Sequence, residues 1–133
     1  MKLPESVQKF LEKPNFAVLA TISPSGQPQA TPVWFILDGD QILINTSKGR
    51  VKLRNLTANP RVALEIHDLA NPYQYVQIRG KVVKIDPTVG ARDIDRLSQR
   101  YRGKAYSYPS TDAPANRVSI HIQPTAVNTM GFK

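Results

Sequence analysis

The sequence contains no cysteine, and this absence excludes several kinds of site. A chain without cysteine forms no disulfide, has no thiolate nucleophile and offers no sulfur ligand to zinc or to an iron–sulfur cluster. No stretch approaches the roughly 20 consecutive apolar residues of a membrane-spanning helix. Charges are spread through the first sixteen residues, unlike the apolar centre of a signal peptide, so we expect a cytoplasmic protein.

Acidic residues are scarce relative to basic ones. Ten Asp and Glu stand against eighteen Lys and Arg, which gives a formal net charge of +8. Such an excess attracts anions, and it favours nucleic acid, a membrane surface or a phosphorylated small molecule as the partner. With 133 residues, 41% of them hydrophobic, the chain has enough apolar material for one packed core, and we expect a single domain over residues 1–133.

Apolar residues that alternate along the first half of the chain predict β-strands. The pattern predicts three strands joined by tight turns, at 16–23, 28–37 and 41–47. Pro28 and Pro32 lie within the second of them, and proline cannot donate to a sheet, so that strand is expected at an edge or a bulge. Ahead of these strands, a short amphipathic helix is predicted from the helical spacing of Val7, Phe10 and Leu11.

The second half of the chain is predicted to mix strands with two further helices. Strands are expected at 61–68 and 71–86, the second with a bulge at Gly80, and a short helix is expected just before Pro60. A helix from Asp86 to Gly103, a loop at 103–116 and two short strands around Pro124 complete the chain. Six or seven strands without regular strand–helix alternation favour a mainly β fold, a small antiparallel barrel, over a parallel sheet.

The segment from Asn45 to Asn55 predicts an anion-binding site. It leaves a predicted strand, passes hydroxyl residues and a glycine, and enters a predicted helix, so free backbone N–H groups would face an incoming anion. Arg50 and Lys52 add charge, and arginine can form a bidentate fork on phosphate. The interval from Lys48 to Arg61 holds five cations and no acid. The alternative interpretation is an ordinary solvated basic helix.

The other candidates for chemistry are few. Trp34, the single tryptophan, lies on the proline-interrupted strand, where freed backbone groups could contact a planar heterocycle; the alternative is that it belongs to the core. His67 and His121 are expected on a solvent or interface face, and their spacing matches no metal motif. Asp38 and Asp40 flank a turn glycine, and Asp93 and Asp95 lie two residues apart on a predicted helix, where they diverge. Neither pair predicts acid–base catalysis.

Taken in order, these features resemble the pyridoxamine 5′-phosphate oxidase-like split β-barrel superfamily. Within it, the sequence is most similar to the F420-dependent reductases, the flavin/deazaflavin oxidoreductases of the B group. The resemblance covers nearly the whole chain, and its most specific parts are the LATI–G–P–PVWF stretch and the GR-x-K-x-x-N-L-x-x-NP stretch. It implies a six-stranded antiparallel split barrel with two or three short helices, which forms a homodimer with two equivalent cofactor sites at the subunit interface.

The resemblance also implies which residues meet the cofactor. Its phosphate would be bound by residues of the basic segment, which are Ser47, Lys48, Arg50 and Lys52, with Asn55 supporting the turn. The ring system would lie along Pro32, Val33 and Trp34. Gln77 and Arg79, on a later strand, are expected near the ring or the interface. No metal ion is expected.

The function that follows from the resemblance is hydride transfer from reduced coenzyme F420, a deazaflavin, to an electron-poor organic acceptor. Alternatives are an FMN-dependent oxidoreductase of the pyridoxamine-phosphate oxidase type and a carrier that binds F420 or flavin without catalysis. A nucleic-acid-binding barrel is less favoured, because the basic segment contains no aromatic residue for base stacking. No catalytic residue is assigned; the candidate proton donors, should the 103–116 loop cover the site, are Tyr101, Tyr106, Tyr108 and Arg102.

Overall fold

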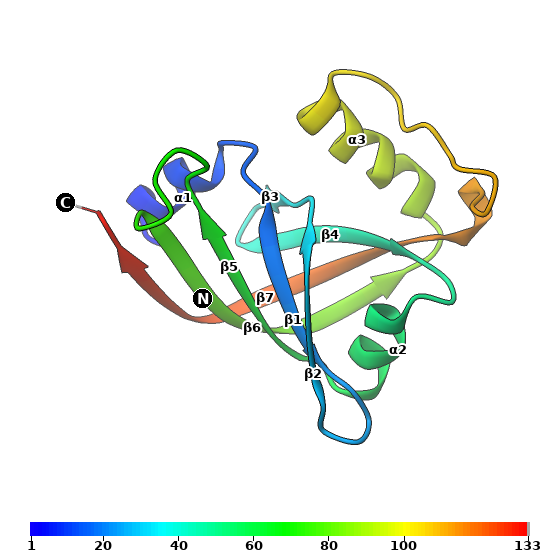
Figure 1. Cartoon of the computed structure of the whole chain (residues 1–133), viewed down its shortest axis with the longest axis horizontal. Helices are drawn as coiled ribbons and strands as arrows, with labels where there is room; N and C mark the ends of the chain where they lie inside the picture. The colour runs from blue at the N-terminus through cyan, green and yellow to red at the C-terminus, as the bar shows by residue number, and fades with distance from the viewer. Residues whose placement is uncertain (133) are drawn as a thin grey trace.

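Seven β-strands and three α-helices are formed by residues 1–132, the part of the chain that the computed structural model describes (Figure 1). In chain order the elements are α1 (Glu5–Leu11), β1 (Ala17–Ile22), β2 (Pro28–Val33), β3 (Ile36–Asp38), β4 (Gln41–Ser47), α2 (Val51–Ala58), β5 (Arg61–His67), β6 (Tyr75–Asp86), α3 (Gly90–Arg102), a 3-10 turn (Pro114–Asn116) and β7 (Arg117–Met130).

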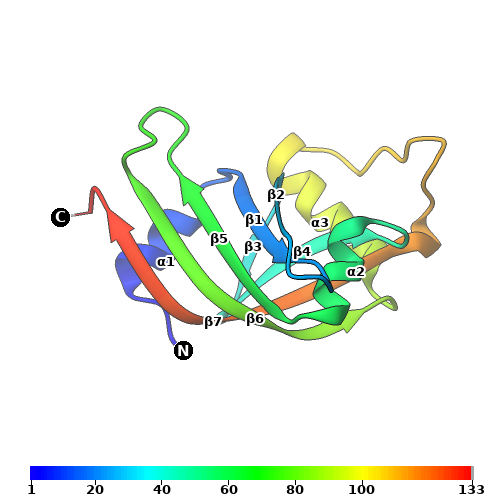
Figure 2. The same ribbon diagram turned by 60° about the horizontal axis from the view of Figure 1, so that its bottom comes forward.

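All seven strands belong to one antiparallel sheet, in the order β2-β1-β5-β6-β7-β4-β3. Figure 2 shows β1, β5, β6 and β7 side by side as one curved layer. The two edges of the sheet, β2 and β3, are consecutive in the chain and are joined through Trp34 and Phe35. The sheet is therefore open between β2 and β3, which are the two ends of the strand order, and at this split the barrel is connected only by the polypeptide chain itself. Pro28 and Pro32 lie on the edge strand β2, as predicted.

The mainly β antiparallel fold is confirmed, but the expected six strands are seven. The predicted strand at 28–37 is divided in two, because the chain leaves the edge at Val33 and pairs with β4 only from Ile36 onward. The helix expected from Asp86 begins four residues later, at Gly90. It ends where expected, because Gly103 takes a left-handed φ of 71°.

The two short strands expected around Pro124 are also wrong, since β7 is continuous. Its register with β6 shifts between Arg79 and Gly80, so that Gly80 faces Pro124 and Arg79 faces Ala126. Thr125 is the extra residue on β7 and forms a bulge there. The bulge lies directly after Pro124, which has no N–H to donate to the sheet, and regular pairing resumes at Ala126. The bulge predicted at Gly80 is confirmed, and a Cβ there would lie 2.7 Å from the Gln123 carbonyl oxygen.

The core lies inside the curved sheet, and the helices close its open sides. Val7, Phe10 and Leu11 of α1 are buried in it, beside inward-facing residues of the strands such as Leu19 and Ile44. The helix α3 packs against β7 and β4, while α2 packs against β1 and β4. None of the helices in the described part of the chain is long and apolar enough to span a membrane.

A buried aspartate fastens α3 to the sheet. The Asp93 carboxylate is fully buried and accepts hydrogen bonds from the Ser119 hydroxyl on β7, at 2.6 Å, and from Arg92 and Arg96, each at 3.1 Å. Burial raises the pKa of Asp93, but these hydrogen bonds outweigh it and hold the pKa below the usual value of an aspartate. The helix therefore has a fixed position over the end of the barrel.

Candidate functional site

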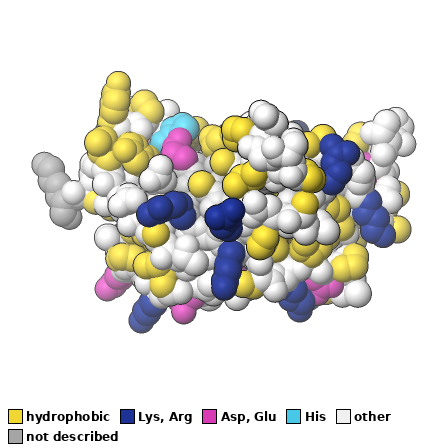
Figure 3. Space-filling model, turned by 90° about the horizontal axis from the view of Figure 1, so that it is seen from below, with side chains coloured by type: hydrophobic (Ala, Val, Ile, Leu, Met, Phe, Trp, Pro, Cys, Tyr) yellow, Lys and Arg dark blue, Asp and Glu magenta, His cyan; other side chains and the backbone are white. Residues whose placement is uncertain are grey.

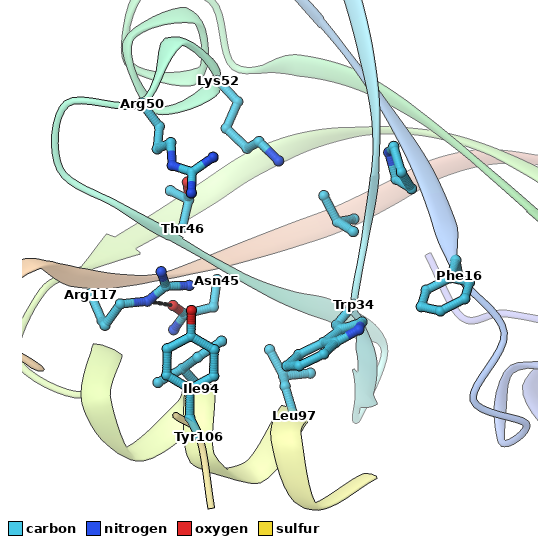
Figure 4. Close-up of a pocket in the computed structure, with 12 residues that line it drawn as sticks. Phe16, Trp34, Asn45, Thr46, Arg50, Lys52, Ile94, Leu97, Tyr106 and Arg117 are labelled. Carbon is cyan, nitrogen blue, oxygen red and sulfur yellow. Dashed lines mark hydrogen bonds between the residues drawn. The ribbon is translucent and has the colours of Figure 1, made fainter. Parts of the chain in front are cut away.

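A pocket of about 320 Å³ opens beside the split in the barrel (Figure 4). It lies between α2, α3 and the link from β2 to β3, and the end of β4 and the first residue of β7 complete its lining. One end of its lining is basic and polar, and the rest is aromatic and aliphatic. The lining residues are Phe16, Pro32, Val33, Trp34, Asn45, Thr46, Arg50, Lys52, Ile94, Leu97, Tyr106 and Arg117.

The basic end is formed where β4 turns into α2. Gly49 takes a left-handed φ of 90°, which turns the chain so that Arg50 and Lys52 both reach the pocket beside Thr46. Burial, followed by the charges of Arg50 and Arg117, lowers the pKa of Lys52 below 10.5. Among the residues that the structure describes, no acidic side chain lines the pocket. Within residues 1–132, neither Arg50 nor Lys52 forms an ion pair, so this end has unneutralised positive charge.

The third cation of the pocket, Arg117, is held differently. Its Nε donates to the Asn45 Oδ1 at 2.9 Å, and its Nη1 donates to the Asp112 carboxylate at 2.9 Å. The side chains of Arg117 and Asp112 are 7% and 9% exposed, so the ion pair is buried. Asn45 in turn donates to the Gly90 carbonyl oxygen at the start of α3. Arg117 therefore fixes the loop that carries Asp112, and the charge available to a ligand comes mainly from Arg50 and Lys52.

The aromatic end is organised around Tyr101 on α3. Its ring stacks between those of Trp34, with centroids 5.4 Å apart, and Phe16, with centroids 5.7 Å apart. Its hydroxyl donates to the Asn15 carbonyl oxygen at 2.7 Å and lies 3.2 Å from the Phe35 N–H, which donates to it. Burial raises the pKa of this hydroxyl above that of a free tyrosine. Tyr101 thus holds both chain segments that carry the rings stacked on it, those of Phe16 and Trp34.

A neighbouring arginine strengthens the same support. The Arg100 guanidinium donates to the Phe35 carbonyl oxygen at 3.0 Å and to three carbonyl oxygens at the end of α1, those of Leu11, Glu12 and Lys13. These carbonyls belong to the last residue of α1 and the two residues after it, and carbonyl oxygens at a helix C-terminus have no partner within the helix. The C-terminal end of α3 therefore connects α1 to the split in the barrel.

The structure brings together half of the residues predicted to meet a ligand. Pro32, Val33, Trp34, Arg50 and Lys52 all line the pocket. The others lie outside its lining, and they are Ser47, Lys48, Asn55, Gln77 and Arg79.

Those five residues lie in three parts of the structure: the end of β4 with the turn after it, α2, and β6. The Ser47 carbonyl oxygen accepts the Arg50 N–H at 3.2 Å, and the side chain of Lys48 is exposed on the turn. The Asn55 side chain is buried and donates to the Thr21 hydroxyl at 3.1 Å, which ties α2 to β1. Gln77 and Arg79 are exposed on the outer face of β6, away from the pocket.

Sequence reasoning missed several residues of the lining. Asn45 and Thr46 belong to the predicted anion-binding segment but were not named as ligands. The signal that could have identified them is a polar pair at the end of an apolar strand. Phe16 and Arg117 come from positions far from that segment in the sequence, whereas Tyr106, named above as a candidate proton donor of the 103–116 loop, does line the pocket. For Arg117 the one local signal is a charged residue at the start of an apolar strand, which is common on protein surfaces.

The sequence model of the family described as pyridoxamine 5′-phosphate oxidase matches residues 3–131. The chain belongs to this family. The resemblance inferred from the sequence is thereby confirmed. No curated protein sequence matches the chain.

Solved structures agree with membership of the pyridoxamine 5′-phosphate oxidase family. A protein named F420 reductase is 37% identical, covers 95% of this chain and 98% of its own, and superposes with a TM-score of 0.84. A conserved hypothetical protein from Mycobacterium tuberculosis, 24% identical with coverage of 96% and 84%, has a TM-score of 0.76. The heme storage protein HutZ from Vibrio cholerae, 18% identical with coverage of 99% and 97%, has a TM-score of 0.69. The last two show the fold alone.

Proposed function

We propose that this protein is an oxidoreductase that binds coenzyme F420 and reduces an electron-poor organic acceptor. One observation supports the proposal most directly: a single pocket joins two cations without acidic partners to a wall of aromatic rings. A planar redox heterocycle with a phosphate on its side chain has matching chemistry at both ends.

In this proposal the protein binds and orients, and the hydride chemistry comes from the reduced cofactor. Arg50 and Lys52 would bind the phosphate, and Thr46 offers a hydroxyl beside them. Trp34 and Val33 would lie along the ring system. A ring system bound against these side chains would displace water from that end, which would strengthen the electrostatic interactions around it.

FMN is the alternative cofactor, and the charge outside the pocket favours F420. Lys48 and Arg54 are exposed on the same turn and helix as the two pocket cations. FMN ends at its phosphate, whereas F420 continues into a tail of carboxylates that these outer cations could attract. Removal of both outer charges, in Lys48→Met/Arg54→Met, should weaken binding of F420 and leave binding of FMN nearly unchanged.

The experiment that tests the proposal is a fluorescence polarisation titration of the purified protein with F420 and with FMN. Micromolar or tighter binding to F420 is expected. Binding to neither compound would contradict the proposal. The carrier alternative is separated by mixing the protein and reduced F420 with quinone and nitroaromatic acceptors, because a carrier binds the cofactor without accelerating its oxidation.

A homodimer with the site at the subunit interface remains part of the proposal. Gln77 and Arg79 lie on an exposed strand face outside the pocket, so a second copy is the means by which they could approach a cofactor. Light scattering should give the mass of two chains. We also propose a cytoplasmic location, which fractionation of expressing cells would check.

A further inference from the structure

Reduction of an acceptor by hydride requires a proton as well, and the pocket lining contains few groups able to supply one. Arginine does not release its proton in proteins. Lys52 lies at the basic end, where it is needed for the anion. The Tyr101 hydroxyl already donates to a backbone carbonyl oxygen. Within the lining, Tyr106 remains as a candidate, and any other proton donor has to come from the rim of the pocket.

A histidine–carboxylate pair lies on the outer face of β5. The Nδ1 of His67 is 2.7 Å from one carboxylate oxygen of Glu65 and 3.2 Å from the other. Both side chains are partly open to solvent, at 34% and 40% exposure. The carboxylate accepts the Nδ1 hydrogen and fixes the ring, so that Nε2 is the nitrogen left to exchange a proton with another molecule.

The register of the sheet places this pair next to the pocket. Ala17 on β1 faces Ile66 on β5, and Val18 faces Glu65. The pairing of the two strands ends at Ala17 and Ile66, and Phe16 and His67 are the next residues along the two chain segments. Ala17 and Ile66 are fully buried, so their neighbours at Phe16 and His67 both point to the outer face.

Phe16 lines the pocket and is 43% exposed, so it forms the outer rim. Directly opposite residues on one face of an antiparallel pair have Cβ atoms roughly 5 Å apart. Figure 3 shows the outer face, where a histidine stands beside an acidic side chain among hydrophobic and uncharged groups. The pair therefore lies outside the pocket lining but on the side of its Phe16 rim, which is the aromatic end where an acceptor would meet the cofactor ring.

We propose that His67, oriented by Glu65, is the general acid that protonates the acceptor. The inference rests on the proposed function. An acceptor such as a quinone gains two electrons with the hydride from the reduced cofactor and becomes an anion. The anion takes the proton on Nε2 of the imidazolium; that N–H bond breaks, its electron pair stays on nitrogen, and a new O–H bond forms. A proton from the solvent then returns to Nε2, while the hydrogen bond from Nδ1 to Glu65 keeps the ring in place.

The chain has two histidines, and His121 provides a matched control. It lies on β7 opposite Leu43 and is not part of the pocket lining. His67→Gln should slow single-turnover reduction of menadione by the F420-loaded protein about 100-fold, the range typical of a lost general acid. His121→Gln should leave the rate and the F420 affinity unchanged. Added imidazole should restore much of the rate to His67→Ala, which a purely structural role would not allow.

A second measurement does not depend on turnover. In a proton–carbon NMR spectrum of the full protein with oxidised F420, the His67 ring signal, assigned from its loss in His67→Gln, should shift when menadione is added. The His121 signal should not. A rate unchanged in His67→Gln but lost in Tyr106→Phe would overturn the inference and leave the proposed function intact. Failure to bind F420 or FMN at all would instead refute the proposed function.

Discussion

The charge of Lys52 is expected to have opposite effects on ligand binding and on stability. The side chain is partly buried, and it lies close enough to Arg50 and Arg117 for burial and both charges to lower its pKa. In the ligand-free protein this charge is therefore unfavourable, whereas a bound anion would make it favourable. Lys52→Met removes the charge and keeps a long unbranched side chain, so it separates the two effects.

The two expected effects of Lys52→Met are opposite: the affinity for F420 falls, and the stability of the ligand-free protein rises. A charge-assisted hydrogen bond contributes roughly 1.5–3 kcal/mol, so the affinity for F420 should fall about 10-fold to 150-fold. The ligand-free variant should gain about 0.5–1 kcal/mol, as is common when charges are removed from a binding site. For a chain of this size that gain raises Tm by about 2–4 °C.

Fluorescence polarisation with F420 measures the first effect, and thermal unfolding without ligand measures the second. Lys9→Met is the matched control, because it removes the same charge from an exposed position on α1, outside the pocket. If both variants weaken binding equally, Lys52 acts only through the overall charge of the protein, and the assignment of this end of the pocket to the phosphate is refuted. A fall in Tm for Lys52→Met would refute the electrostatic argument.

The pH dependence follows from the direction of the shift. A lysine whose pKa is lowered in the folded state destabilises the protein below that pKa, and the unfavourable contribution disappears as the pH rises through it toward 10.5. The advantage of Lys52→Met over the unmodified protein should therefore shrink as the pH approaches 10.5. An advantage that stays constant over that range would contradict the link between the charge and the stability.

Three further substitutions test how the site is supported. Gly90→Ala should destabilise the fold by about 3 kcal/mol in urea unfolding, because the added Cβ would collide with the Arg117 carbonyl oxygen. Asp93→Asn should lose about 1–3 kcal/mol at neutral pH; since the native pKa is lowered, that difference should vanish as the pH falls well below 3.8, and a constant difference would count against it. Tyr101→Phe keeps the stacked ring but loses the hydrogen bonds of the hydroxyl to the Asn15 and Phe35 backbone. The loss of cofactor affinity should therefore be larger than the loss of stability that the change in Tm reports.

The local parts of this molecule were predictable, and the parts that depend on distant contacts were not. Alternating apolar residues predicted most strands, and Arg50 and Lys52 stood out because they lie in one acid-free interval of the chain. The apolar run from Val33 to Leu37 carried no signal that the barrel splits there, since a buried link and a strand have the same composition. Arg117 joins the pocket only because β7 pairs with β4, a contact over some seventy residues that no short segment records.

The three cations of the pocket have different surroundings: one is neutralised within the fold, and two are left for a ligand. Arg117 is buried with Asp112, and a buried arginine without that partner would be strongly destabilising. Arg50 and Lys52 have solvent on one side, so the protein tolerates their mutual repulsion without an acid nearby. An acidic partner placed beside them would relieve the repulsion but would also compete with any incoming anion. The acid-free end of the pocket is thus the arrangement expected when a ligand, and not the protein, provides the missing negative charge.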